Sequence, residues 1–228
     1  MCTVSYIPKG SGYILTSNRD ESPLRVTYSP EEKELKNGTK IIAPIDSEKG
    51  GTWIATDGAN KTACIMNGGF IKHKRQLPYR KSRGHIIYEA FSSETFGTFA
   101  DNTDLCNIEP FTLVLVDENK LSVLIWDGKE KHIQSLDSSK KHLWSSSTLY
   151  TREDHAKKMN YFQEFLRLNE SDPENLLKLH GLYNDNLFVL DQPHVKTVST
   201  TQVVVSNGES DLCYREKVYD HEKKELLY

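Results

Sequence analysis

The sequence contains little cysteine, and its four cysteines stand far apart at positions 2, 64, 106 and 213. None of them forms a C-x-x-C pair or a C-x-x-C-H haem-attachment motif, and the wide spacing excludes the usual zinc and disulfide-framework patterns. We therefore expect reduced thiols, a cytoplasmic protein, and neither a metal nor a cofactor.

Long apolar runs are also missing from the sequence. No segment approaches the length of about 20 apolar residues that spans a bilayer, so stable membrane insertion is not expected. The first residues lack the basic start and apolar core of a signal peptide, and we expect the mature chain to begin at or next to Met1.

The sequence has no strong net charge of either sign, since it contains 29 Lys and Arg and 32 Asp and Glu. This balance gives no net attraction toward nucleic acid, and no nucleic-acid partner is expected. One local exception is the basic stretch "KHKRQLPYRKSR" at residues 72–83. A solvated loop is the ordinary interpretation of such a stretch, and contact with a phosphate or an anionic substrate is the alternative.

Repeats, low-complexity tracts and linkers rich in Pro, Gly or Ser are absent too, and 228 residues suffice for one core, so we expect one domain over 1–228. Short runs rich in β-branched and aromatic residues, separated by turn residues, predict antiparallel strands. These runs are "TVSYI", "GYILTS", "GTWIAT", "TACIMN", "FTLVLVD", "LSVLIWD", "KHIQSL", "TQVVVS" and "LCYREKV".

Three segments carry helix signals. Residues 81–92 place apolar side chains on one side, and residues 151–169 do so after a capping box of Thr151 and Asp154. Asp172 followed by Pro173 predicts the start of a shorter helix. Strands, helices and strands again, without regular βαβ alternation, indicate the α+β class. Nothing in this pattern indicates an oligomeric state.

Cys2 is the first candidate for chemistry. Removal of Met1 would give Cys2 a free α-amine, whose unperturbed pKa of about 7.7–8.0 suits a base that accepts the thiol proton. Nucleophile and base would then belong to one residue. The alternative interpretation is a small buried side chain at the start of a strand.

The tetrad Asn18-Arg19-Asp20-Glu21 is the second candidate. Arg19 would lower the pKa of a neighbouring thiol and amine if its strand pairs with the first strand. Asp20 and Glu21 could hold the arginine or the terminal ammonium, and Asn18 could donate to a substrate carbonyl. The alternative is a polar turn after a strand.

Four ordered blocks, "MCTVSYIP", "GYILTSNRDES", "GGTWIATDG" and "ACIMNGGF", resemble the NRDE family, which is named for the tetrad and includes the transport-and-Golgi-organisation proteins of animals. That family is similar to the N-terminal nucleophile hydrolases of the choloylglycine hydrolase and penicillin V acylase kind. The resemblance implies an αββα sandwich of two antiparallel sheets between helix layers.

The resemblance also implies roles for individual residues. Cys2 matches the acylase nucleophile, and Arg19 and Asp20 match the assisting pair, although the acylases place that pair three residues apart. Asn67 matches the amide that stabilises an oxyanion. A hydrogen-bond donor has its largest effect where negative charge develops in the transition state, as it does on this oxygen. The alternative interpretation is that Asn67 ends a strand at a turn before Gly68 and Gly69.

Three further positions bear on the site. Trp53 is expected in the core or in the wall of a pocket. Ser146, in "SSST", stands where acylases have an asparagine, and we expect it near the substrate together with Asn18 and Glu21. Val198 stands where relatives often have an arginine.

Two functions follow from the resemblance. The first is a cysteine amidohydrolase that cleaves the C–N amide bond of a small acylated molecule. The second is a carrier or chaperone without catalytic activity, which binds haem or an acyl-lipid in the same cleft. The partner is accordingly a small amide or acyl substrate in the first case and haem or a lipid in the second.

Overall fold

The computed structural model describes residues 3–118 and 120–217, and the strands within them form two antiparallel sheets. The first sheet has five strands in the order β10-β1-β2-β11-β12. Its strands are β1 (Thr3–Lys9), β2 (Gly12–Glu21), β10 (His142–Ser145), β11 (Lys196–Ser206) and β12 (Glu209–Glu216).

The second sheet has seven strands, which follow one another in chain order from β3 to β9. They are β3 (Thr27–Glu34), β4 (Lys40–Asp46), β5 (Ile54–Thr56), β6 (Lys61–Asn67), β7 (Phe111–Asp117), β8 (Lys120–Trp126) and β9 (Lys131–Leu136). The chain leaves the first sheet after β2, forms the whole second sheet, and returns to the first sheet at β10. The first sheet is therefore built from two separate segments of the chain, with the second sheet between them in the sequence. The prediction of one domain over 1–228 stays a prediction, and this interleaving supports it.

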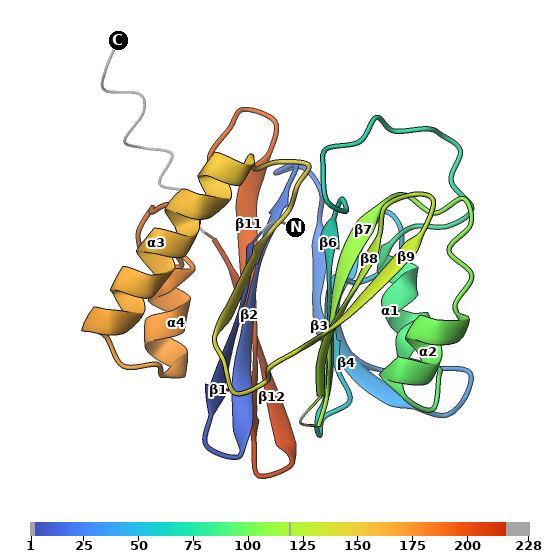
Figure 1. Ribbon diagram of the computed structural model, residues 1–228, viewed down its shortest axis with the longest axis horizontal. Helices are drawn as coiled ribbons and strands as arrows, with labels where there is room; N and C mark the ends of the chain where they lie inside the picture. Colours follow the sequence, from blue (N-terminus) through green and yellow to red (C-terminus); the bar gives the residue numbers. More distant parts are fainter. Residues whose placement is uncertain (1–2, 119, 218–228) are drawn as a thin grey trace.

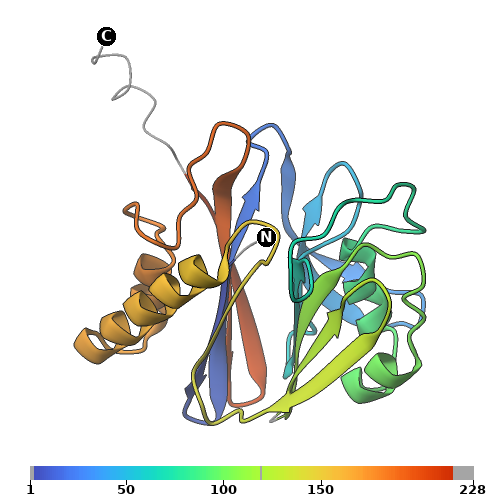
Figure 2. The same ribbon diagram turned by 45° about the horizontal axis from the view of Figure 1, so that its top comes forward.

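Helices cover the outer face of each sheet. Figure 1 shows α3 (Arg152–Leu168) and α4 (Pro173–Leu179) against the five-stranded sheet, and α1 (Gly84–Phe91) and α2 (Phe96–Asn102) against the seven-stranded sheet. The turned view in Figure 2 keeps the same order of layers. The predicted α+β class and αββα sandwich are therefore confirmed.

Alternation along the inner strands builds two cores. On β1 and β2, Val4 and Leu15 belong to the large cluster between the sheets, whereas Ile7 and Ile14 belong to a smaller cluster with α3 and α4. Successive side chains of a strand point to opposite faces, so a central strand covered on both sides is apolar throughout. The short runs "TVSYI" and "GYILT" show this composition.

The helix predictions are largely confirmed. Thr151 and Asp154 form the predicted capping box of α3, and Asp172 accepts a hydrogen bond from the Asn175 N–H at the start of α4. Helix α2, which Thr95 caps, was not predicted. No helix in the described part of the chain has both the length and the apolar content that a membrane span needs.

Helix α1 begins at Gly84, three residues later than predicted, and its first residue is packed against another segment. A Cβ on Gly84 would lie 2.8 Å from the carbonyl oxygen of Thr52, so only glycine allows the two backbones to approach this closely. This contact brings residues 51–53 beside the start of the helix, at the edge of the pocket described below.

A buried polar network joins the helix layer to β1 and β2. His180, the C-cap of α4, has no exposed surface, and its Nδ1 and Nε2 lie 2.9 Å from Asn18 Oδ1 and 2.8 Å from Ser5 Oγ. The Asn18 oxygen can only accept, so Nδ1 donates and Nε2 accepts from the serine. Burial, together with the charge of Lys158, lowers the pKa of His180 to about 3.

This network predicts a pH dependence of stability. Because the folded-state pKa lies below the ordinary value of 6.5, the contribution of His180 is complete above pH 6.5 and is lost as the pH falls toward 3. Replacement by His180→Gln removes the titration, so between pH 7 and pH 5 the variant should lose roughly 2 kcal/mol less free energy of unfolding than the parent. Urea unfolding at both pH values measures this difference, and equal losses in the two proteins would contradict the prediction.

Candidate active site

The tetrad is divided between the two faces of β2. Asn18 and Asp20 lie on the face toward α3 and α4, and the Asp20 carboxylate accepts hydrogen bonds from Tyr150, just before α3, and from Thr197 of the neighbouring β11, at 2.8 and 2.6 Å. Arg19 and Glu21 point toward the seven-stranded sheet. The predicted pairing of this strand with β1 is confirmed, since Thr3 lies opposite Asn18, and the polar-turn alternative is wrong because the tetrad lies within β2.

Asn18 supports the structure and is not available to a substrate. Its Nδ2 donates to the carbonyl oxygens of His180 and Phe188, at 3.1 and 2.9 Å, and the side chain has no exposed surface. Both amide hydrogens are therefore used by the backbone of the α4 region. This finding corrects the predicted donation by Asn18 to a substrate carbonyl.

Arg19 is held between the sheets, with only 3% of its surface exposed. Its Nη2 lies 2.6 Å from Asp46 Oδ2, its Nη1 donates to Thr27 Oγ1 at 2.9 Å, and its Cζ lies 4.6 Å from the centroid of the Trp53 ring. Burial lowers the pKa of the guanidinium, and the carboxylate of Asp46 opposes this shift. The group stays charged and fixed in one position.

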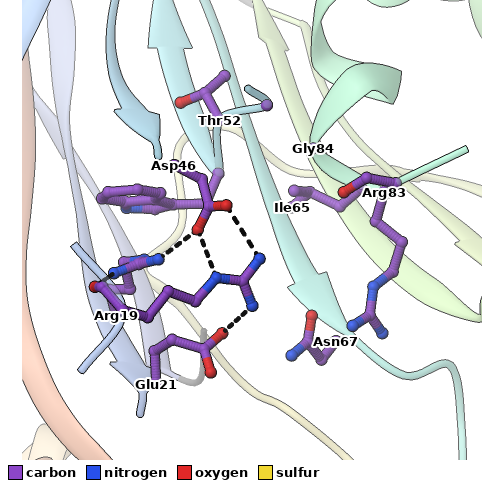
Figure 3. A pocket seen from close by; sticks show the side chains of 12 residues that line it. Arg19, Glu21, Asp46, Thr52, Ile65, Asn67, Arg83 and Gly84 are labelled. Carbon is purple, nitrogen blue, oxygen red and sulfur yellow. Dashed lines mark hydrogen bonds and ion pairs between the residues drawn. The ribbon is translucent and has the colours of Figure 1, made fainter. Parts of the chain in front are cut away.

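Asp46, the last residue of β4, binds two arginines and was missed in the sequence. Arg25 reaches Asp46 with Nε at 2.7 Å and Nη2 at 3.0 Å, and Arg25 Nη1 also pairs with Glu21 at 2.9 Å (Figure 3). Partial burial disfavours the carboxylate, but the hydrogen bonds from Arg25 and the Lys49 N–H, with both positive charges, lower the pKa of Asp46. The predicted partners Asp20 and Glu21 are thus replaced by Asp46 in the ion pair with Arg19. An acid that ends the apolar run "IIAPID" was the available signal.

Asn67 ends β6 and contributes its side chain to the same pocket as Arg19. Its carbonyl oxygen accepts a 2.7 Å hydrogen bond from Ser146 Oγ. Gly68 follows with φ of +86°, and a Cβ there would lie 2.4 Å from Ser147 Oγ, so the turn needs glycine. Asn67 therefore has both expected features, since it ends a strand before a turn and its side chain also lines the pocket.

Ser146 supports Asn67 from the segment after β10. It is only 2% exposed, and its Oγ also lies 2.8 Å from Thr148 Oγ1. The hydroxyl thereby fixes the backbone on which the Asn67 amide is presented. Direct contact of Ser146 with a substrate stays a prediction.

Lys158 is a buried cation that the helix pattern did not indicate. This α3 residue is 3% exposed, its Nζ donates to Thr3 Oγ1 at 2.7 Å, and it lies 3.2 Å from the centroid of the Tyr150 ring. It therefore ties the helix layer to the first described residue of β1. Cys2, the predicted nucleophile, lies outside the described residues.

A second charged cluster surrounds Glu109, which is 7% exposed. Its carboxylate lies 3.0 Å from Arg75 Nε, 3.3 Å from Arg83 Nη2 and 3.3 Å from His73 Nε2. Burial lowers the pKa of Arg83, and the charge of Glu109 opposes this shift. One carboxylate thus serves two arginines.

A pocket of about 80 Å³, smaller than the pockets beside it, opens between the two sheets at the end where β2 and β6 finish, and we call it the main pocket because Arg19 and Asn67 both line it. The predicted residues Arg19, Glu21, Trp53 and Asn67 line it. The rest of its lining comes from Arg25, Asp46, Gly51, Thr52, Ile65, Ser82, Arg83 and Gly84 (Figure 3). Trp53 is 3% exposed, and it both belongs to the core and forms part of the wall, as predicted.

Metal ligands are not gathered at this pocket. Across residues 3–118 and 120–217, no three His, Cys, Asp or Glu side chains lie in an arrangement that could hold a metal ion. Val198, where relatives often have an arginine, is half-buried next to the irregularity in β11 between Thr197 and Ser199. The positive charges of the site therefore come from β2 and from the segments that carry Arg25 and Arg83.

Solved structures with the same fold are N-terminal nucleophile hydrolases. The N-acylethanolamine-hydrolyzing acid amidase ortholog of Caenorhabditis elegans has a TM-score of 0.64 at 12% identity, over 93% of this chain and 100% of the other. A mutant conjugated bile acid hydrolase from Clostridium perfringens scores 0.59 at 8% identity, over 95% and 92%. Penicillin V acylase from Agrobacterium tumefaciens scores 0.53 at 10% identity, over 95% and 86%. At these identities the shared property is the fold.

The family is established by sequence. A model described as Transport and Golgi organisation 2 matches residues 1–214, and the chain belongs to this family. No curated protein sequence matches the chain. The predicted resemblance to the NRDE family, and through it to N-terminal nucleophile hydrolases, is confirmed.

The ion pairs of Asp46 lead to a prediction about stability. Asp46→Asn leaves Arg19 buried without its carboxylate, and this should lower the free energy of unfolding at pH 7 by about 3 kcal/mol. The folded-state pKa of Asp46 is lowered, so its contribution is complete above about pH 4 and is lost as the pH falls through that lower value. The difference in free energy of unfolding between the parent and the Asp46→Asn variant should therefore become smaller below about pH 4.

Glu32→Gln is the matched control, because Glu32 pairs with Lys40 while both side chains are about 60% exposed. Loss of such a surface pair should change the free energy of unfolding only slightly, because water screens both charges. Denaturant unfolding across the pH range gives both values. If the two substitutions lower the free energy of unfolding equally, the Asp46 ion pairs do not stabilise the contact between the two sheets.

Proposed function

We propose that the protein is a cysteine amidohydrolase that cleaves the C–N amide bond of a small acylated molecule. One observation supports this most: Arg19 of β2 and Asn67 of β6 belong to opposite sheets and yet line one pocket. The strand β1, which begins directly after Cys2 in the sequence, lies beside β2 with Thr3 opposite Asn18. The widely spaced cysteines are consistent with a cytoplasmic location, which we also propose.

The proposed reaction has two steps. The α-amine of a mature Cys2 accepts the thiol proton, the thiolate attacks the amide carbon, and the C–N bond breaks as the proton passes to the departing nitrogen. Water then attacks the thioester, which releases the carboxylic acid and restores the thiol. The Asn67 amide would donate to the oxygen that carries negative charge in both steps.

Arg19 and Asp20 would act from the two faces of β2. The guanidinium is fixed by Asp46 and Trp53, and its charge favours the thiolate over the thiol. Asp20 is fixed by Tyr150 and Thr197 on the helix-facing side, from which it would orient the start of β1. These are different tasks, so the two residues need not stand three apart as in the acylases.

A second candidate is a carrier for an acyl-lipid or haem. The observation in its favour is a pair of adjoining hollows whose lining includes Met66, Phe70, Leu149 and Trp144. Such a surface suits an apolar chain or a ring system. A carrier should keep its affinity for the ligand when Cys2 is replaced by alanine.

Replacement of the nucleophile tests the hydrolase directly. Cys2→Ala should abolish release of amine from a panel of N-acyl p-nitroanilides, and Asn67→Ala should lower kcat by about 10²–10³ because a donor to the oxyanion is lost. Cys106→Ala, which removes an exposed thiol, is the control and should keep the parent rate. A Cys2→Ala protein that releases amine as fast as the parent would sink the proposal.

A second measurement addresses the base. Intact mass of protein made without an N-terminal tag should show that Met1 has been removed. An acyl adduct of the corresponding mass should then form on the parent and be missing from Cys2→Ala. A retained Met1 in active protein would exclude the α-amine of Cys2 as the base.

A further inference from the structure

The basic stretch at residues 72–83 contributes to a pocket that adjoins the main one. This anion pocket, as we call it, shares Glu21, Arg25, Asn67 and Arg83 with the main pocket and has a volume of about 300 Å³. Its other lining residues are Lys72, His73, Arg75, Glu109 and Thr148. Four permanent cations and two carboxylates therefore face it, and the positive charge is in excess.

The cations of the anion pocket are incompletely neutralised. Arg25 has Glu21 and Asp46 as ion-pair partners. Arg75 and Arg83 share the single carboxylate of Glu109. Lys72 is exposed and forms none of the ion pairs found among the described residues. The excess charge is therefore concentrated at Lys72, Arg75 and Arg83, on the side away from Asp46.

Arg83 is the best placed of these cations. Its side chain is 17% exposed, and it is held by Glu109 and by the carbonyl oxygen of Pro110, to which Nη1 donates at 3.2 Å. Arg83 and Asn67 each line both pockets, and Figure 3 shows the guanidinium of Arg83 on the side of Asn67. A fixed guanidinium binds a carboxylate in a defined geometry at a small entropic cost.

An apolar groove begins where the anion pocket ends. Thr148 and Lys72 line both, and beyond them lie Phe70, Ile71 and Leu149. Phe70 and Ile71 are 54% and 70% exposed, although large apolar side chains are usually covered. An apolar chain in this groove would bring its polar end to the anion pocket.

We propose that the amine part of the substrate carries a carboxylate, which Arg83 and Lys72 bind, while the acyl chain lies in the apolar groove. The substrate class is then the N-acyl amino acids. This assignment rests on the proposed function and specifies its substrate. Hydrolysis adds OH to the acyl carbon and H to the nitrogen, and the products are a fatty acid and a free amino acid.

Binding to the Cys2→Ala protein tests the assignment without turnover. N-octanoylglycine and N-octanoylethanolamine have the same acyl chain and differ in the carboxylate. By calorimetry at low salt, we expect the glycine compound to bind at least tenfold more tightly. Arg83→Gln should remove this preference, and Lys72→Gln, at an exposed position where folding is not at risk, should reduce it several-fold.

Lys74→Gln is the matched control, since Lys74 is exposed on the same loop and does not line the main pocket, the anion pocket or the apolar groove. It should keep the full preference. Equal affinity for the two compounds, or a preference that survives both Arg83→Gln and Lys72→Gln, would overturn the assignment.

Turnover by the parent separates the two proposals. Faster hydrolysis of the glycine compound supports both of them. If the parent hydrolyses the ethanolamine compound at an equal or higher kcat/KM, the hydrolase stands and the carboxylate site is overturned. If the carboxylate preference is found in binding but neither compound is hydrolysed, the site stands and the hydrolase fails.

Discussion

The ion pair between Arg19 and Asp46 joins the two sheets at the point where the pocket opens. A buried guanidinium without a partner would be very unfavourable, and so β2 and β4 have to remain at the distance that keeps this pair at 2.6 Å. Trp53 covers the guanidinium on the side of the seven-stranded sheet. The width of the gap between the sheets, and hence the shape of the pocket, depends on this contact.

The alternation of β2 gives the tetrad two functions. Asn18 connects the strand to the α4 region, and Asp20 accepts hydrogen bonds from Tyr150, directly before the cap of α3, and from Thr197 of the neighbouring strand β11. Arg19 and Glu21 belong to the charged wall of the pocket. A sequence motif that looks like one catalytic unit is thus half structural, and this follows from the two-residue period of a strand.

Local patterns predicted most of the fold, and distant contacts were missed. The capping box of α3 and the Asp172 cap of α4 depend on residues close in sequence, and both are present. Strand β3, with the sequence "TYSPEEKE", was missed because an exposed edge strand carries no apolar alternation. Asp46 was missed as the partner of Arg19 because 27 residues separate them.

Charge neutralisation decides where the site can bind an anion. Arg19 and Arg25 face the main pocket together with Asp46 and Glu21, so two cations and two carboxylates balance there, and a substrate carboxylate meets no excess positive charge. On the opposite side of Asn67, Glu109 is shared by Arg75 and Arg83 and cannot balance both. Asn67 therefore stands between a neutral side and a positive side. A substrate whose amide reaches Asn67 would be oriented by this difference in charge. If the substrate bound in the reverse direction, its negative end would lie away from the uncompensated cations.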